Sequence, residues 1–139
     1  MTDVVELLLL AMNRHDLDGA VSLFHEDYRS EQPAHPDRAF VGRAQVRVNW
    51  EAMFAGIPDF HTELIRRVSD GDTTWTEMVW SGTKKHEEPF EARGVALFEI
   101  SDGLIVAARL YMEEVTRELG GIAQAVEGVS GRLPRTAGT

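Results

Sequence analysis

The sequence contains no cysteine, and this absence excludes several kinds of site at once. Disulfide bonds, thiolate nucleophiles and zinc–thiolate centres all need cysteine, so this chain cannot form them. Its five histidines never stand two, three or four residues apart, so no single helix or strand presents a pair of imidazole metal ligands. Glycine-rich phosphate loops and serine-nucleophile motifs are also missing. We therefore expect no metal and no other cofactor.

Long apolar runs and excess positive charge are also lacking. The most apolar stretch, VVELLLLAM, is far too short to span a bilayer and contains Glu6, and no basic segment precedes it as in a signal peptide. We expect a cytoplasmic protein that does not associate with membranes. The chain has 14 basic and 23 acidic residues and a net charge of −9, so most of its surface would repel nucleic acid. No nucleic-acid partner is expected.

At 139 residues and 43% hydrophobic content, the chain is long enough for one compact domain and short for two. Asp3 stands three residues before Glu6, which is typical of a helix start, and a continuous apolar stretch to Met12 then predicts a buried helix. Asp16 can cap a second short helix, and Gly42 precedes a third. The apolar faces of these two helices comprise Ala20, Val21, Leu23 and Phe24, and then Val46, Trp50, Met53 and Phe54.

Strands dominate the second half of the chain. A short strand is expected at residues 28–32, before Pro33, and four antiparallel strands at about 60–68, 74–83, 90–100 and 104–113, separated by turn sequences. A helical segment can follow to about Leu119. We therefore divide the chain into one domain, residues 1–119, and a C-terminal extension, residues 120–139. The order of its AQAVEG stretch is left open, and its last eight residues have the composition of a disordered tail.

This order predicts an α+β fold in which three N-terminal helices cover one face of a curved antiparallel sheet. Alternation places Thr76, Met78 and Trp80 on the inner face. The next strand contributes small residues to that face, which leaves volume for an apolar internal pocket. The alternative is a core filled by Trp50, Trp80 and the leucine-rich helix. Charged residues on the outer face are expected to pair across neighbouring strands or to form a dimer surface, and the alternative is that Arg93 or Arg109 binds an anionic ligand.

The segments AMNRHDLDGAVSLFHEDYRSEQP, IPDFH, GD, WSGT and FEISDGLI, in this order, resemble the SnoaL-like branch of the nuclear transport factor 2-like superfamily. The resemblance covers residues 4 to about 115. It implies a cone formed by a curved sheet around three helices, with a hydrophobic pocket inside, and frequently a homodimer made through the sheet. It does not define a reaction, because this fold carries isomerases, dehydratases, cyclases, epoxide hydrolases and non-catalytic adaptors.

The catalytic residues that the resemblance would supply are absent. Gln32 stands where related ketosteroid isomerases hold the aspartate that takes the proton, and an amide cannot do so. The other positions of the isomerase and epoxide hydrolase sites hold apolar residues, namely Leu8, Ala96, Met78, Trp80 and Leu110. These replacements point to an unusually apolar pocket. Its expected ligand-binding residues are Tyr28, Ser30, Gln32, Trp50, Met78, Trp80, Phe98, Leu110 and Met112.

His61 and Gln32 are the candidate catalytic residues. An imidazole exchanges protons near neutral pH, and Glu63 could orient it, while Gln32 would orient the ligand. The resemblance places His61 at the border of the pocket. The alternation instead favours Phe60 and Leu64 for the interior, which would turn His61 outward, and the sequence leaves both arrangements open.

The sequence therefore predicts a homodimeric protein that binds a small hydrophobic molecule in its cone. If it is an enzyme, the expected chemistry is isomerisation, cyclisation, dehydration or epoxide hydrolysis without a cofactor. The alternatives are a binding module that has the same pocket without chemistry, and a dimeric assembly domain whose cone is filled and leaves room for only a few waters.

Overall fold

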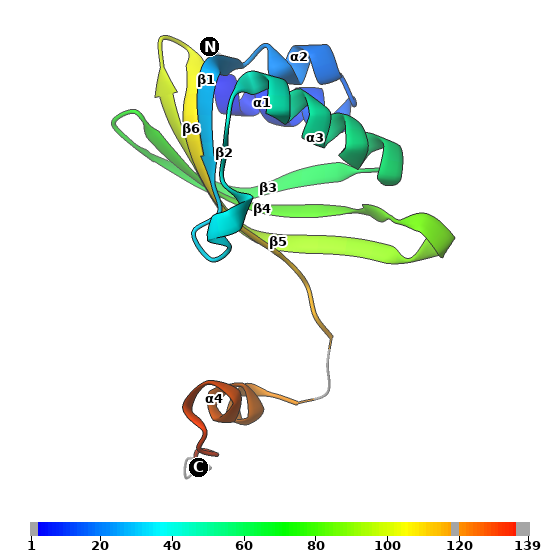
Figure 1. Ribbon diagram of the computed structural model, residues 1–139, viewed down its shortest axis with the longest axis vertical. Helices are drawn as coiled ribbons and strands as arrows, with labels where there is room; N and C mark the ends of the chain where they lie inside the picture. The colour runs from blue at the N-terminus through cyan, green and yellow to red at the C-terminus, as the bar shows by residue number, and fades with distance from the viewer. Residues whose placement is uncertain (1–2, 118–119, 136–139) are drawn as a thin grey trace.

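A computed structural model describes residues 3–117 and 120–135 of the chain, and Figure 1 shows the arrangement of its elements. Two single-turn 3-10 helices, Pro36–Arg38 and Lys85–Glu87, lie in connections. No helix in the described ranges is long and apolar enough to cross a membrane. The main elements are α1 (Val4–Asn13), α2 (Leu17–Val21), β1 (Phe24–Glu31), β2 (Phe40–Val41), α3 (Arg43–Gly56), β3 (His61–Asp70), β4 (Thr73–Thr83), β5 (Pro89–Ser101), β6 (Leu104–Glu114) and α4 (Ile122–Ser130).

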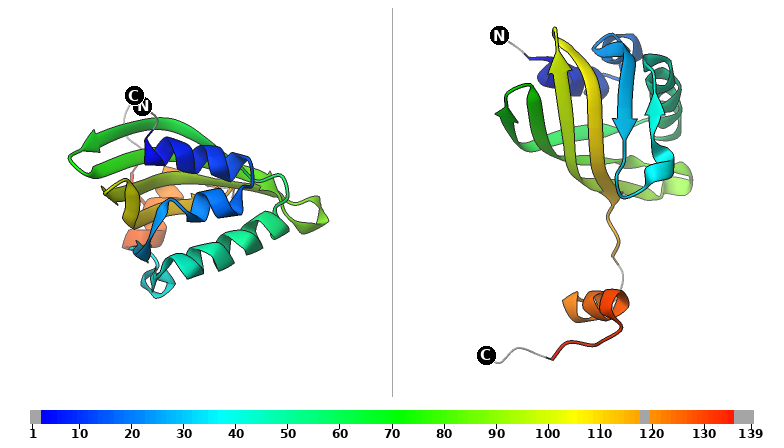
Figure 2. Two further views of the ribbon diagram at one scale, coloured as in Figure 1. Left: turned by 90° about the horizontal axis from the view of Figure 1, so that it is seen from above. Right: turned by 60° about the vertical axis from the view of Figure 1, so that its left-hand side comes forward.

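All six strands form one curved, unclosed sheet in the order β2-β1-β6-β5-β4-β3. α1, α2 and α3 cover its concave face, and α4 stands apart from the sheet (Figures 1 and 2). β3 to β6 form the predicted antiparallel meander. β1 joins the free edge of β6 in parallel, so the sheet is mixed and not wholly antiparallel as expected. The α+β cone predicted from the sequence is confirmed.

β1 begins earlier than predicted. Phe24 was assigned to the second helix, but it pairs with Ile105 of β6, and the Leu23 carbonyl accepts a hydrogen bond of 2.9 Å from the Ile105 N–H. The helix ends at Val21 because the edge of β6 offers the following backbone a partner that the sequence pattern does not reveal.

The C-terminal part also differs from expectation. Residues 115–117 are not helical, and the Val115 N–H instead donates to the Glu91 carbonyl at 2.9 Å. The end of that predicted helix, residues 118–119, lies outside the described residues. The AQAVEG stretch belongs to α4, which ends at Gly131 in the left-handed conformation that favours glycine. Of the predicted disordered tail, residues 136–139 lie outside the described residues.

The core lies between the helices and the concave face of the sheet. The inner-face residues of β4 and β5 are buried as the alternation predicts, among them Met78, Ala96 and Phe98. In β6 both Ile105 and Ala108 are buried, because the register of β5 and β6 shifts between Glu99 and Ile100. This shift turns an odd-numbered residue inward and breaks the simple alternation.

Candidate functional site

A small cavity lies inside the cone, between the helices and the concave face. α1, α3 and five strands contribute to its wall, so it is the point at which both halves of the sequence meet. Its volume is about 60 Å³. The lining residues are Leu8, Leu9, Met12, Phe24, Tyr28, Trp50, Thr62, Met78, Trp80, Phe98 and Leu110.

The wall of this cavity offers only two side-chain hydroxyl groups. Tyr28 is buried, and desolvation raises its pKa to about 12, although the neighbouring Ser30 hydroxyl acts in the opposite direction. The Thr62 hydroxyl makes a weak contact of 3.9 Å with the Met78 sulfur. Tyr28 therefore stays neutral at physiological pH, and its hydroxyl group remains a hydrogen-bond donor.

Aromatic rings close one side of the cavity. The Trp50 ring lies 5.2 Å from Phe60 and 5.6 Å from Trp80, measured between centroids, in edge-to-face arrangements. Trp50 comes from α3, whereas the other two rings come from the sheet side of the cone. Edge-to-face aromatic pairs add specific packing energy beyond the area that they bury, so this cluster ties α3 to the sheet.

The cavity is much smaller than an ordinary ligand pocket. Its 60 Å³ correspond to about the volume of two water molecules in the liquid. Pockets that enclose drug-sized molecules measure roughly 300–1,000 Å³. The rings of Trp50 and its neighbours occupy the space that the small residues of β5 leave free.

The structure brings most of the predicted ligand-binding residues to this cavity, but not all. Ser30 is buried inside the fold without reaching the cavity wall, and Met112 is buried elsewhere in the core. Gln32 lies after the end of β1, where its Oε1 accepts a hydrogen bond of 3.0 Å from Arg38 Nη1. The residues that do line the cavity are Tyr28, Trp50, Met78, Trp80, Phe98 and Leu110.

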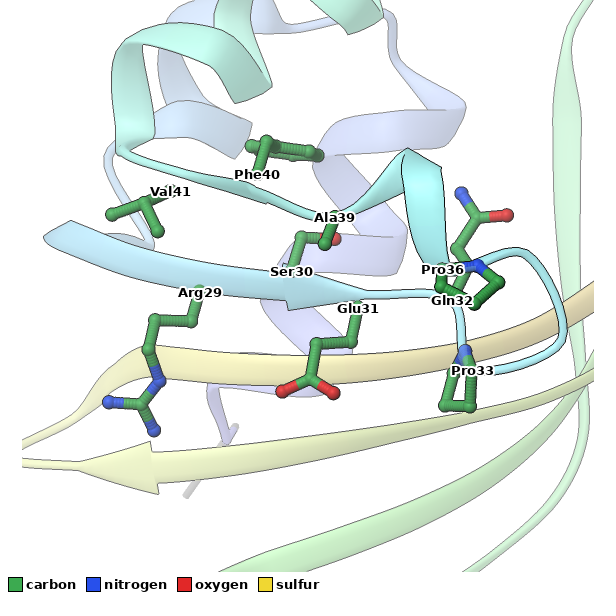
Figure 3. A pocket seen from close by; sticks show the side chains of 9 residues that line it. All are labelled: Arg29, Ser30, Glu31, Gln32, Pro33, Pro36, Ala39, Phe40 and Val41. Carbon is green, nitrogen blue, oxygen red and sulfur yellow. The ribbon is translucent and has the colours of Figure 1, made fainter.

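Ser30 and Gln32 instead border a shallow surface hollow around β1 and β2, of about 390 Å³. Figure 3 shows that Ser30 points toward Ala39, while Arg29 and Glu31 point to the opposite side of β1. The alternation predicted for this stretch is therefore present. Of the two predicted polar residues that border the hollow, Ser30 is buried, whereas Gln32 is half-buried and hydrogen-bonded to Arg38.

His61 does not face the cavity: of the two arrangements that the sequence leaves open, the structure has the outward one. It is exposed at the start of β3, and so is Glu63, while Thr62 between them is buried and lines the cavity. The strand alternation, which favoured Phe60 and Leu64 for the interior, decides the orientation. Among the described residues, the cavity wall contains no imidazole and no carboxylate.

For His15, which stands in the connection between the first two helices, the sequence favours a position on the solvated surface, and the structure corrects this. It is half-buried, its Nε2 lies 2.8 Å from the Phe60 carbonyl oxygen, and its ring stacks on Phe54 at 4.4 Å. These contacts hold the connection between α1 and α2 against the start of β3. His15 is therefore a structural residue beside the aromatic cluster.

Sequence reasoning missed several residues of the cavity wall. Thr62 could have been predicted, because alternation turns the residue between two outward-facing neighbours inward. The apolar stripe of α1 could have indicated the residues that this helix contributes. Phe24 could not have been predicted, because its pattern is that of a helix. The missed residues are Leu8, Leu9, Met12, Phe24 and Thr62.

On the outer face of the sheet, charged residues from neighbouring strands pair as expected. Arg66 Nε lies 3.2 Å from Glu77 Oε1 across β3 and β4. Glu91 contacts both Arg93 at 2.6 Å and Arg117 at 2.7 Å, and these guanidinium groups lower the pKa of its carboxyl. No group of three or more acidic residues or histidines within the described ranges is placed to hold a metal ion.

A curved sheet around three helices with an apolar cavity is the architecture of the nuclear transport factor 2-like proteins. Residues 5–108 match the model of the SnoaL-like domain, and the chain belongs to this family. No curated protein matches the chain.

Solved structures with this fold resemble the chain at low sequence identity. A protein with a ketosteroid isomerase-like fold from Catenulispora acidiphila, in complex with trimethylamine, is 20% identical, with a TM-score of 0.69 over 78% of this chain and 84% of that one. An epoxide hydrolase from M. tuberculosis is 21% identical, with a TM-score of 0.69 over 79% and 80%. A putative ketosteroid isomerase from Kribbella flavida is 20% identical, with a TM-score of 0.67 over 95% and 88%. These similarities show the fold.

Proposed function

We propose that this SnoaL-like protein binds a small, uncharged, apolar molecule in the cone, without acid–base catalysis by its own side chains. The composition of the cavity wall supports this proposal. Nine of its eleven residues are apolar, and the other two, Tyr28 and Thr62, offer hydroxyl groups. A charged ligand would lose its hydration there and find no partner of opposite charge, at a cost of several kcal/mol.

The ligand class follows from the Tyr28 hydroxyl. Because the pKa of Tyr28 is about 12, this group remains a hydrogen-bond donor throughout the physiological range. A ketone, ester or ether oxygen would accept a hydrogen bond from this hydroxyl group, and the rest of the molecule would contact aromatic and aliphatic side chains. We therefore propose a ligand with one exposed oxygen acceptor on an apolar skeleton.

We further propose that α3 moves outward to admit this ligand. α3 has 14 residues, of which only Val46 is fully buried, while Trp50, Met53 and Phe54 pack half-buried against the core. It begins after Gly42, whose φ of 108° is accessible mainly to glycine, and it carries Trp50 into the cavity wall. Displacing Trp50 would enlarge the cavity at the cost of the aromatic contacts with Phe60 and Trp80.

A second candidate function is a dimeric assembly domain with a filled cone. The cavity volume of about 60 Å³ favours it, because this is the space of a few waters that such a domain would leave. The two candidates differ in one property. A binding protein takes up an apolar molecule saturably, and an assembly domain does not.

Tryptophan fluorescence can test the proposal. Trp75 is 47% exposed and lies on the outer face, so a Trp75→Phe variant retains only Trp50 and Trp80, which both line the cavity. Cyclohexanone serves as the neutral probe with one oxygen acceptor. Trimethylamine, the molecule bound to the structural neighbour, is a cation at pH 7 and serves as the charged probe. We expect saturable quenching by cyclohexanone and none by trimethylamine.

Two further observations give the test its specificity. Leu8→Phe adds a ring to the cavity wall and should weaken cyclohexanone binding at least tenfold, whereas the exposed Val48→Phe should not change it. The methyl resonances of Met12 and Met78 should shift on binding. Binding of trimethylamine alone would refute the uncharged ligand, and the absence of saturation with both probes would favour the assembly domain.

A further inference from the structure

α4 is a well-defined helix with an unpartnered apolar face. At its start, the Gly121 N–H donates to Gln124 Oε1 at 2.8 Å, and at its end the Gly131 N–H donates to the Glu127 carbonyl at 2.8 Å. A nine-residue helix is too short to be stable alone in water, so α4 needs a surface to pack against. Three residues of α4 form its apolar stripe, and Leu133, which follows the helix, continues it. The three residues are Ile122, Val126 and Val129.

This stripe is exposed. The exposed fraction is 81% for Ile122 and 92% for Val129. Among the described residues, no hydrogen bond or ion pair joins α4 to residues 3–117, and α4 lies beyond the end of β6 (Figures 1 and 2). The chain's own domain therefore leaves the apolar face of α4 uncovered.

The segment that leads to α4 is held in place as it leaves the domain. The Val115 N–H donates to the Glu91 carbonyl at 2.9 Å, and Arg117 Nη2 lies 2.7 Å from Glu91 Oε1. Both contacts fix the segment beside the start of β5. Beyond these contacts the chain continues past the end of the sheet (Figures 1 and 2).

The outer face of the sheet has a groove that suits such a helix. The groove measures about 420 Å³. It is formed by two neighbouring rows of cross-strand partners, and each row runs from β4 across β5 and β6 to β1. Trp75, Leu97 and Ala107 form an apolar floor. Charged residues lie around it, and the ion pairs Arg29–Glu99 at 3.8 Å and Arg109–Glu31 at 3.7 Å are long enough for these side chains to rearrange around a partner.

We propose that α4 of one copy packs into this groove on a second copy of the chain, and that reciprocal exchange of α4 forms a closed dimer. Charge favours this occupant. Residues 120–139 contain two arginines and one glutamate, so the extension is net positive on a chain whose total charge is −9. The acidic domains repel each other, and a positive extension reduces this repulsion at the contact.

The homodimer through the sheet, which the sequence predicts, would gain a specific contact from this exchange: the apolar stripe of α4 against the floor at Trp75, Leu97 and Ala107.

Sedimentation equilibrium of the full chain tests the contact. Ile122→Glu with Val129→Glu places two charges on the stripe and should raise the dimer dissociation constant at least tenfold. Gly128→Glu adds a charge to the opposite face of α4, where a side chain meets open space, and should leave the constant unchanged. A wild-type chain that is monomeric at 100 μM, or equal weakening by both variants, would overturn the proposal.

Cross-linking identifies the occupant of the groove. Because the chain has no cysteine, Val129→Cys and Leu97→Cys each introduce a single thiol. Mixing the two variants under mild oxidation should give a disulfide-linked heterodimer, and replacing the first by Gly128→Cys should reduce its yield several-fold. A chain that carries both cysteines and forms only an intramolecular disulfide, at any protein concentration, would show that α4 covers its own domain and would refute the exchange.

Discussion

Asn13 binds the backbone of Thr62 in both directions. Its Oδ1 accepts the Thr62 N–H at 2.7 Å, and its Nδ2 donates to the Thr62 carbonyl at 2.9 Å. Thr62 lies on β3, an edge strand, so these backbone groups have no neighbouring strand on that side. The last residue of α1 thus replaces a strand at the point where β3 contributes to the cavity wall.

Removing this side chain should destabilise the domain. We expect Asn13→Ala to lower the free energy of unfolding by about 1–3 kcal/mol, because two partly buried backbone groups lose their partner. Urea denaturation monitored by circular dichroism would measure the change. Asn49→Ala removes a half-buried amide whose side-chain partner among the described residues is Gln45, one turn away on the same helix, and it should change stability by less than about 0.5 kcal/mol. Similar losses in the two variants would contradict this role of Asn13.

The sequence could not predict the role of Asn13. A polar residue at the end of an apolar stretch indicates only that the helix stops. Its partner lies 49 residues away, and which backbone groups of an edge strand remain free depends on how the helix is placed against the sheet. His15, which contacts the Phe60 carbonyl, was misjudged for the same reason.

Tyr28 should make stability fall at high pH. Its pKa is raised from 10.0 to about 12 in the folded state, so between these values the unfolded chain releases a proton that the folded chain retains. Rising pH therefore favours unfolding, and this effect should amount to about 2–3 kcal/mol once pH exceeds the folded value. Tyr28→Phe should remove this part of the pH dependence.

Spectroscopy can isolate this titration. The chain has two tyrosines, so a Tyr111→Phe variant retains Tyr28 alone. Its tyrosinate absorbance should appear near pH 12 in the folded protein and near pH 10 in urea. A midpoint near 10 in the folded protein would show that Tyr28 is solvated, and it would contradict the desolvation of its hydroxyl group.

Gly94 is required by the close approach of the β6 backbone, not by the volume of the cavity. A Cβ atom at this position would lie 1.9 Å from the Tyr111 carbonyl oxygen, which belongs to the neighbouring strand and cannot move independently. We expect Gly94→Ala to cost more than about 3 kcal/mol or to prevent folding. Gly128→Ala, where nothing lies within 4 Å, should leave the unfolding of the domain unchanged.

Alternation in the sequence identified which faces of the strands point inward, but not how much space remains between them. Period-two patterns place Met78 and Phe98 at the cavity because each side chain of a strand points to one of only two faces of the sheet. Cavity volume depends on where large side chains such as Trp50 settle, and that is decided by packing between distant elements. The small residues of β5 therefore suggested an open pocket that aromatic rings largely fill.

Asp3 should stabilise the start of α1 in two separable ways. Its Oδ1 accepts the Glu6 N–H at 2.9 Å as the N-cap, and its other oxygen pairs with Arg67, chiefly through a hydrogen bond that lowers the pKa of Asp3 below 3.8. Asp3→Ala removes both contacts and should cost about 1–2 kcal/mol at pH 7. Asp3→Asn retains the cap and loses the ion pair, which is worth less than about 1 kcal/mol at this exposed site.

The two contributions should respond differently to acid. Because the folded pKa is lowered, the ion pair contributes fully above pH 3.8 and is lost as pH falls through the folded value. The difference in unfolding free energy between the wild type and Asp3→Asn should therefore narrow as the pH falls below 3.8, whereas Asp3→Ala should remain the least stable. Urea denaturation at pH 7 and at about pH 2.5 measures both differences. A gap between wild type and Asp3→Asn that is as large at the lower pH as at pH 7, with the wild type showing no acid-dependent loss relative to Asp3→Asn, would mean that Arg67 does not act through the charge of Asp3.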